Sequence, residues 1–263
     1  KNYVLKNYNK SFFYVMIILT YMFYLGPIEN IFQPNAFSTP TGSMMNTILI
    51  GDMFLSNDMA YGIHNPLSGN YFCVYNKPKR GDIVEFSSRN LNFMTNQEKY
   101  NYTKRILALP GDTLEIRYRL IYINDEFYEL PGTAKLDVSE PNLTKPDSKI
   151  FPKGSGWNQD NYGPLIIPKA GQTVHLDSSN IHTWRQVIED EGNLVEVTWS
   201  KIIINDEEDY EYTFRKNYYF MIGDYWYNSL DSRYFGFVAE DDIISKLTMI
   251  YFSWDGSVRW DRL

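Results

Sequence analysis

Short apolar runs separated by turn-forming residues limit the possible folds of this chain more than any other feature. Gly81 to Phe86, Arg105 to Leu109 and Thr113 to Tyr118 are runs long enough for a strand but short for a helix. Pro110-Gly111-Asp112 and Asn124-Asp125 follow such runs, and these residue types favour tight turns. The pattern predicts a mainly β fold.

The section from residue 118 to residue 215 differs from the rest, because proline and glycine divide it into short pieces. The dividing residues include Pro131, Gly132, Pro141, Pro146, Pro152, Gly154, Gly156, Gly163 and Pro164. We expect residues 118–215 to form an inserted cap lobe that is small and rich in β structure. Within it, Leu120 to Asp125 and Lys201 to Asp206 each predict a strand that ends in a turn. Residues 29–117 and 216–263 are expected to form the two parts of one β core.

An apolar run near the start of the chain predicts a membrane anchor. Residues 11–28 carry no charge, and their number only just reaches the roughly 17–25 residues that cross a bilayer as a helix. Lysines precede the run and Glu29 follows it, so the positive-inside rule places residues 1–10 in the cytoplasm as a basic segment and the rest outside. A cleaved signal peptide and a buried soluble helix are alternatives, but no small-x-small site follows promptly and the run has no polar face. The first residue is lysine, which leaves room for a further span upstream.

Charge and cysteine content exclude several classes of function. The net charge is -7, and acidic runs at Glu189 to Glu191 and Asp206 to Asp209 contradict the basic face that a nucleic-acid partner requires. We expect both runs to be solvated loops. Cys73 is the only cysteine, so the chain cannot form an internal disulfide or a Cys/His metal cluster. We expect Cys73 to be buried and inert, and we predict no metal and no cofactor.

A serine in a hydroxyl-rich turn, Pro40-Thr41-Gly42-Ser43-Met44, is a candidate nucleophile. A serine nucleophile needs a base, and none of the three histidines lies in a setting that suggests a triad. A buried lysine is an alternative base, provided that burial lowers the pKa of its amine from about 10.4. Lys104 suits this role because it lies in an apolar strand, where successive residues face opposite sides. Lys104 is then buried, while Arg105 reaches the solvent.

Four segments together resemble the motifs of bacterial type I signal peptidases. Pro40 to Thr47 resembles the box that carries the nucleophile, and Pro78 to Val84 resembles the second box of that family. Tyr102 to Asp112 resembles the box that carries the lysine base, and Gly223 to Val238 resembles the last box. Order, spacing and content all agree with the family pattern, from the apolar run almost to the C-terminus.

The resemblance implies a signal-peptidase-like antiparallel β core with an inserted lobe, preceded by one N-terminal transmembrane helix. It implies a serine endopeptidase with a Ser-Lys dyad that cleaves signal peptides from exported preproteins after small-x-small motifs. Its partners would be the signal peptide and the lipid bilayer. The enzyme would cross the bacterial plasma (inner) membrane once, with its catalytic domain on the periplasmic side.

The resemblance also implies a role for individual residues. Ser43 would attack the scissile carbonyl, and Lys104 would take its proton and later deliver it to the leaving amine. The hydroxyl of Thr41 and the backbone N–H of Ser43 would bind the oxyanion. Ser229 would hydrogen-bond the lysine amine and orient it.

Further residues would support this site or contact the substrate. Asp231 and Arg233 would form a supporting ion pair. The substrate would add as an extended strand beside Gly81 to Phe86 and Tyr102 to Lys104. Small residues at the first and third positions before the cut would enter shallow apolar pockets. The candidates for the walls of these pockets are Phe37, Met44, Ile48 and Tyr102.

One departure from the family pattern lies close to the expected site. Tyr225-Trp226-Tyr227 replaces a polar Asn-Arg-Asp run and puts bulky rings near Ser229. This departure favours an alternative, a catalytically impaired homologue that acts as a structural subunit of a membrane assembly with other partners. A self-cleaving repressor of the Ser-Lys type is a second alternative, but it requires an N-terminal DNA-binding domain where this chain has its apolar run.

Overall fold

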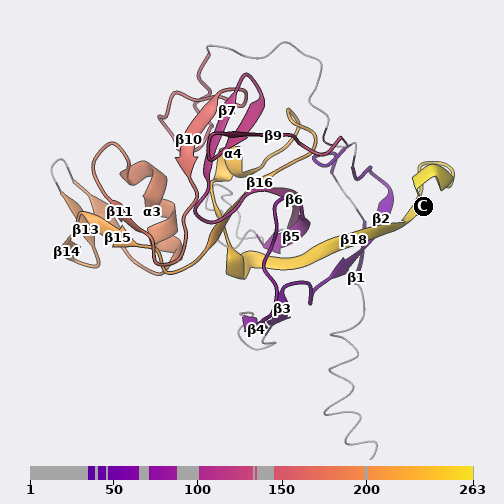
Figure 1. Ribbon diagram of the computed structural model, residues 1–263, viewed down its shortest axis with the longest axis horizontal. Helices are drawn as coiled ribbons and strands as arrows, with labels where there is room; N and C mark the ends of the chain where they lie inside the picture. Colours follow the sequence, from indigo (N-terminus) through magenta and orange to yellow (C-terminus); the bar gives the residue numbers. More distant parts are fainter. Residues whose placement is uncertain are drawn as a thin grey trace, which may run out of the picture.

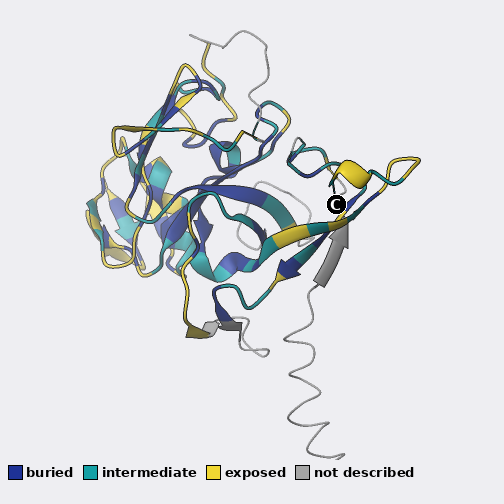
Figure 2. Cartoon of the chain, turned by 45° about the vertical axis from the view of Figure 1, so that its right-hand side comes forward, coloured by how far each residue is buried: buried dark blue, intermediate teal, exposed yellow. Residues whose placement is uncertain are grey.

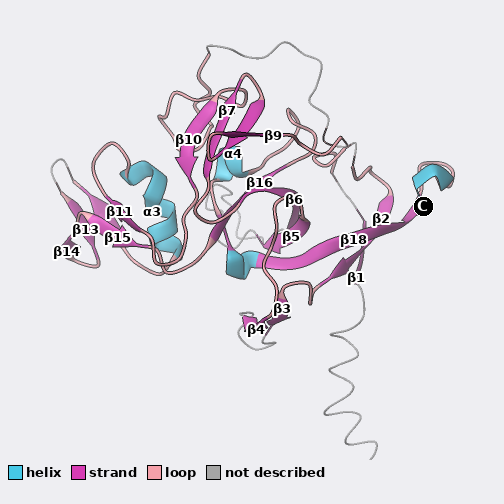
Figure 3. Ribbon diagram, viewed as in Figure 1, coloured by secondary structure: helices cyan, strands magenta, loops and turns pink. Residues whose placement is uncertain are grey.

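The computed structural model of the protein consists mainly of antiparallel strands with a few short helices, as Figure 3 shows, and the prediction of a mainly β fold is confirmed. The structure describes residues 35–38, 41–45, 47–64, 71–87, 101–132, 134, 145–198 and 201–262. Within these ranges, no helix has the length and apolar character needed to cross a membrane. The predicted basic segment 1–10 and anchor 11–28 lie outside the described residues.

Seven antiparallel strands form the largest sheet, and they come from both ends of the described chain (Figure 1). Their spatial order is β1 (Asn35–Ser38), β2 (Asp52–Asn57), β18 (Ile243–Ser253), β5 (Ile83–Ser87), β6 (Asn101–Ala108), β16 (Tyr218–Ile222) and β17 (Val238–Ala239). The long strand β18 therefore lies between β2 and β5 in space, although it is the last strand in the sequence and they are among the first. β3 (Gly62–His64) and β4 (Tyr71–Val74) form a separate two-stranded ribbon.

The middle of the sequence forms a second group of strands. In spatial order, β10 (Tyr162–Ile166), β7 (Thr113–Arg117), β8 (Leu120–Ile123) and β9 (Glu126–Tyr128) make a four-stranded sheet. Beyond it, β11 (Thr173–His175) pairs with β15 (Glu211–Thr213), and β12 (Val195–Val197), β13 (Ile202–Ile204) and β14 (Glu207–Glu208) form a small sheet near helix α3 (Ile181–Asp190). The division into a core and a lobe of residues 118–215 stays a prediction, and its first boundary falls inside the hairpin of β7 and β8.

The two predicted strand-and-turn units are hairpins. Asn124 and Asp125 join β8 to β9 with φ angles of 54° and 66°, and Asn205 and Asp206 join β13 to β14 with φ angles of 50° and 69°. A two-residue turn with positive φ at both positions matches the twist of antiparallel strands, and Asn and Asp tolerate this conformation. Local sequence therefore determines both hairpins.

The large sheet and residues 118–215, which are called the lobe below, contribute buried side chains to one cluster. All five residues of β16 are buried, which explains its uninterrupted apolar sequence, and Figure 2 shows the ribbon at the centre of the protein largely in the colour of buried residues. Trp184 of α3 stacks on Phe237, with ring centroids 6.0 Å apart and an interplanar angle of 6°. Phe237 lies between helix α4 (Ser232–Phe235) and β17. This contact fastens α3 to the segment that follows the expected active site.

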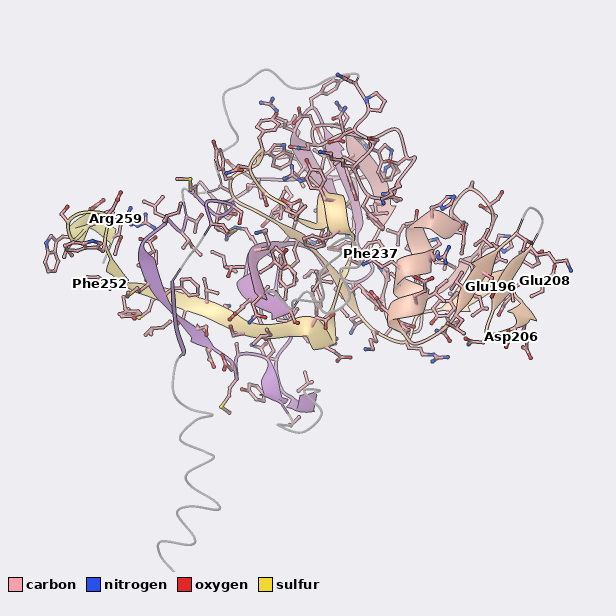
Figure 4. The ribbon with its side chains drawn as sticks, turned by 180° about the vertical axis from the view of Figure 1, so that it is seen from behind. Glu196, Asp206, Glu208, Phe237, Phe252 and Arg259 are labelled. Atoms are coloured by element: carbon pink, nitrogen blue, oxygen red, sulfur yellow. The ribbon has the colours of Figure 1, made fainter. Side chains whose placement is uncertain are left out.

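Asp190 and Cys73 differ from expectation in their exposure. Asp206 and Glu208 are exposed and project from the outer end of the lobe in Figure 4, as a solvated run should. Asp190 instead ends α3 and is half-buried, and this burial, with Asp242 nearby, raises the pKa of its carboxyl to about 8. The expectation of a solvated loop is therefore wrong for Glu189 and Asp190, which belong to α3, and for the exposed Glu207 and Glu208, which form β14. The expectation of a buried thiol is also wrong, because Cys73 is exposed in the small ribbon of β3 and β4.

Candidate active site

Ser43 and Lys104 are in direct contact. Ser43 lies in the turn that precedes β2, and Lys104 lies in β6, where its backbone pairs with Val84 of β5. The Lys104 Nζ donates a hydrogen bond to Ser43 Oγ at 2.6 Å and another to the Thr103 carbonyl oxygen at 3.1 Å. Lys104 is only 2% exposed. The structure therefore brings the expected nucleophile and the expected base together.

Burial changes the acid–base properties of Lys104. It lowers the pKa of the amine from its ordinary value of 10.5 to about 8, although the carboxylates of Asp231 and Asp224 oppose this change. The ring of Tyr102 lies 5.7 Å from Nζ and contributes to the enclosure. An amine with this pKa is partly neutral near pH 8, and its nitrogen is then able to accept a proton from a serine hydroxyl.

Arg105 is buried, so the expectation that it reaches the solvent is wrong. Its Nε and Nη2 donate to the two carboxylate oxygens of Asp224 at 2.8 Å and 2.6 Å, and its Nη1 donates to the Gly81 carbonyl oxygen at 2.8 Å. The hydroxyl of Thr47 also donates to Asp224. A buried charge is tolerated when it is paired in this way. The Arg105–Asp224 pair therefore joins β6 to the loop after β16, and Thr47 joins this pair to the segment that follows Ser43.

Ser229 does not make the expected hydrogen bond with Lys104. The lysine amine bonds to Ser43 and Thr103, and the buried Ser229 Oγ has no hydrogen-bond partner within the described residues. Ser229 packs instead against the backbone of Gly223, where an added Cβ would lie 2.1 Å from Ser229 Oγ and 2.6 Å from the Ser43 carbonyl oxygen. Only glycine at position 223 lets the two serine segments approach so closely.

Asp231 and Arg233 form a fully buried ion pair beside this glycine. The Arg233 Nε and Nη2 donate to the two carboxylate oxygens at 2.9 Å and 2.8 Å, and Nη2 also donates to the Trp226 carbonyl oxygen at 2.7 Å. Asp231 in turn accepts a hydrogen bond from the Gly223 backbone at 3.1 Å. The pair therefore fixes the loop from Gly223 to Ser229 at its start, Gly223, and at its middle, Trp226.

Asp231→Ala is expected to lower the free energy of unfolding by about 3–5 kcal/mol, because it leaves the guanidinium of Arg233 buried without its counter-charge. Urea denaturation followed by tryptophan fluorescence measures this change. The matched control is Glu208→Ala, which breaks an exposed ion pair with Lys201 and should have no measurable effect. An equal, small change in both variants would contradict a structural role for the buried pair.

Thr41 lies within reach of the nucleophile. Its Oγ1 is 3.5 Å from Ser43 Oγ, at the outer limit of a hydrogen bond, and its side chain is exposed. A hydroxyl in this position is able to rotate toward an oxygen bound beside Ser43.

A cavity of about 900 Å³ opens beside the dyad. The predicted site residues in its wall are Thr41, Ser43, Met44, Ile48, Tyr102, Lys104 and Ser229. Phe37 lies in β1, where the strand register places it opposite Phe54 of β2, and the side chain of Phe37 is outside the part that the structure describes. Asp231 and Arg233 are not part of the cavity wall, because they are buried behind it.

Several residues of the cavity wall have no counterpart in the sequence predictions. They are Gly42, Phe54, Asn101, Thr103, Asp147, Lys149, Tyr227, Asn228, Leu230 and Tyr234. Asp147 and Lys149 come from the proline-rich part of the lobe, where no sequence pattern indicates a site. Tyr227 does carry a signal, because it belongs to the run that departs from the family pattern.

The described residues offer neither a histidine base nor a metal site here. His175 and His182 are exposed, and neither they nor His64 of β3 line the cavity. Among the residues that the structure describes, no group of three His, Cys, Asp or Glu side chains is placed to hold a metal ion. The side-chain contact that the structure does show at Ser43 is with an amine whose pKa is about 8.

Comparison with known proteins identifies similar sequences over most of the chain. The sequence profile of the family described as "Signal peptidase, peptidase S26" matches residues 7–254. A Signal peptidase I from Buchnera aphidicola subsp. Schizaphis graminum is 32% identical and covers 97% of this chain and 79% of its own length. A Signal peptidase I from Pseudomonas aeruginosa is 29% identical and covers 97% of this chain and 75% of its own length. A crystal structure of a signal peptidase I from Enterococcus faecalis is 23% identical, covers 66% of this chain and 98% of its own, and superposes with a TM-score of 0.36.

Proposed function

Because the chain belongs to the signal peptidase family, peptidase S26, we propose that it is a membrane-anchored serine endopeptidase that removes signal peptides from exported preproteins. The cut follows a small-x-small motif. The observation that carries the proposal is the 2.6 Å contact between a serine hydroxyl and a buried lysine amine whose pKa is about 8. Together these features meet the requirements of a serine nucleophile without a histidine.

The proposed reaction begins with transfer of the Ser43 proton to the neutral Nζ of Lys104. Ser43 Oγ forms a bond to the scissile carbonyl carbon, and the negative charge moves to the carbonyl oxygen. The backbone N–H of Ser43 and the hydroxyl of Thr41 stabilise that oxygen, where loss of one donor costs roughly 10²–10³ in rate. Lys104 passes the proton to the leaving amine, which breaks the peptide bond. Water, with Lys104 again as the base, then attacks the acyl carbon of the acyl-enzyme. The ester bond to Ser43 Oγ breaks, the signal peptide leaves with a free carboxyl group, and Lys104 returns the proton to Ser43 Oγ.

The proposed location follows from the sequence. Residues 11–28 cross the plasma membrane once, and the catalytic part lies on the periplasmic side, because lysines precede the apolar run. Ser43 then lies a short distance in sequence from the bilayer surface. A signal peptide that is itself embedded in the membrane presents its cleavage site at the same level.

Nothing in the described residues favours the alternative of a structural subunit. The nucleophile and the base are in contact, and the run Tyr225 to Tyr227 does not separate them. The backbone N–H of Tyr225 even donates to the Ser43 carbonyl oxygen at 3.1 Å, which supports the turn that presents the nucleophile.

The proposal is tested with the full chain in detergent and a secretory preprotein that carries Ala-x-Ala before its cleavage site. We expect a single cut directly after the motif, located by mass spectrometry, and labelling of Ser43 by an acylating serine-peptidase inhibitor. A preprotein with bulky residues at both small positions is the control and should stay intact. An uncut preprotein together with an unlabelled serine would overturn the proposal in favour of the structural subunit.

A further inference from the structure

One buried carboxylate of the lobe, Asp160, holds the loop that follows β16. Asp160 is fully buried, and its carboxylate accepts hydrogen bonds from the Tyr227 hydroxyl at 2.9 Å and 3.1 Å and from the Trp226 Nε1 at 3.1 Å. Asp160 precedes β10, whereas Tyr227 and Ser229 follow β16. The bulky rings that depart from the family pattern therefore have a defined partner outside the dyad.

Arg119 completes this anchor. Its Nε donates to the Asp160 carboxylate at 3.1 Å, and its backbone N–H donates to the Asp160 carbonyl oxygen at 2.9 Å. Its guanidinium carbon lies 4.9 Å from the centroid of the Tyr227 ring. Tyr227 is thus held both at its hydroxyl and across its face by a buried ion pair. Such an arrangement restricts the ring to one position.

Tyr227 lines the cavity, whereas Trp226 does not. Trp226 is 1% exposed and packs over Arg233 at 4.3 Å. Tyr227 is half-buried and lines the cavity beside the dyad, as do Leu230 and Tyr234. The two small side chains of a small-x-small motif occupy only part of a cavity of about 900 Å³. The apolar surface around Tyr227 is therefore available to another side chain of the substrate.

We propose that Tyr227 is a specificity-determining residue that contacts an apolar substrate side chain at a position other than the two small ones. Asp160 and Arg119 are positioning residues that hold its ring for this contact. The inference rests on the proposed function, because it concerns the same cavity. Contact with the ring removes apolar surface from water, so peptides with a large apolar side chain at that position are preferred.

The test uses peptides with a constant Ala-x-Ala motif and with alanine, leucine or phenylalanine at each neighbouring position in turn. At one position we expect the wild type to prefer leucine or phenylalanine over alanine by about tenfold in kcat/KM. Tyr227→Ala should reduce this ratio to about twofold or less, mainly through KM. Both kcat/KM values of the ratio are measured with the same enzyme preparation, so the fraction of folded enzyme cancels. A variant that only folds less well therefore keeps the wild-type ratio.

Further variants distinguish the role of the Tyr227 ring from that of the residues that hold it. Tyr227→Phe keeps the ring and its contact with Arg119, and it should retain most of the preference. Asp160→Asn should lower the ratio toward that of Tyr227→Ala, because it removes the carboxylate charge that holds the guanidinium of Arg119 over the ring as well as the tyrosine hydroxyl. The matched control is Tyr210→Ala, since Tyr210 also donates to a carboxylate, that of Glu208 at 2.7 Å, but on the lobe surface. This control should keep the wild-type ratio.

Each outcome of the test bears on a separate statement. An unchanged ratio at every position in Tyr227→Ala overturns the assignment of specificity, and an unchanged ratio in Asp160→Asn overturns the positioning role. If Asp160→Asn does not fold, the double variant Asp160→Asn with Arg119→Gln removes both charges and takes its place. Failure of the wild type to cut any Ala-x-Ala peptide would contradict the proposed function itself, whereas normal cutting with unchanged ratios contradicts only this inference.

Discussion

Ser43→Ala is expected to lower kcat/KM for a signal-peptide substrate by about four to six orders of magnitude. The reason is that Ser43 Oγ is the oxygen in contact with the buried amine of Lys104, and the acyl-enzyme cannot form without it. Single-turnover cleavage with enzyme in excess over substrate measures so slow a rate. The variant should still bind substrate with nearly the wild-type Kd, because only one hydroxyl is lost from the cavity wall.

The control for this variant is Ser178→Ala, which removes an exposed hydroxyl in the lobe and should leave kcat/KM unchanged. Thermal unfolding of Ser43→Ala should match that of the wild type, so that a loss of activity is not a loss of fold. Residual activity within about a hundredfold of the wild type would mean that another group performs the attack.

Lys104→Ala is expected to lower kcat/KM by about four orders of magnitude or more, because the cavity loses its base. The pH profile gives a second signature. The pKa of Lys104 is about 8, and only the neutral amine accepts the serine proton. Wild-type kcat/KM should therefore rise with pH, reach half of its maximum near pH 8, and fall below that pH as the amine becomes protonated.

This rise should disappear in Lys104→Ala, whose residual activity has no lysine to titrate. Lys104→Arg should be equally inactive, because a guanidinium keeps its proton in proteins. Lys153→Ala removes an exposed lysine of the lobe and should keep both the rate and the profile. A wild-type profile that is flat between about pH 6 and pH 10 would exclude Lys104 as the titrating base.

The contact of Ser43 with Lys104 was accessible to sequence reasoning because each residue lies in a recognisable motif. The two hairpins with Asn-Asp turns were accessible for a related reason, since their conformation depends on neighbouring residues alone. The identities of the residues behind the dyad, Asp231 and Arg233, followed from the family motif, but their complete burial did not.

Arg105 shows why the other contacts of the site could not be predicted from the sequence. Strand alternation correctly separates Arg105 from Lys104, but it does not say what covers the second face of the strand. That face is covered by Asp224, which is 119 residues away in sequence. The same holds for Asp160 and Tyr227, whose contact spans 67 residues. Contacts of this kind depend on the order of strands in the sheet, and no local pattern encodes that order.

The position of β18 has a consequence for the timing of activity during synthesis. β18 pairs with β2 on one side and with β5 on the other, and Arg259, just beyond it in Figure 4, donates to the Ile50 carbonyl oxygen at 2.7 Å. A nascent chain that ends at residue 242 contains both Ser43 and Lys104 but lacks the strand that joins their two parts of the sheet. We therefore expect such a chain to have no peptidase activity until β18 has left the ribosome and paired with β2 and β5.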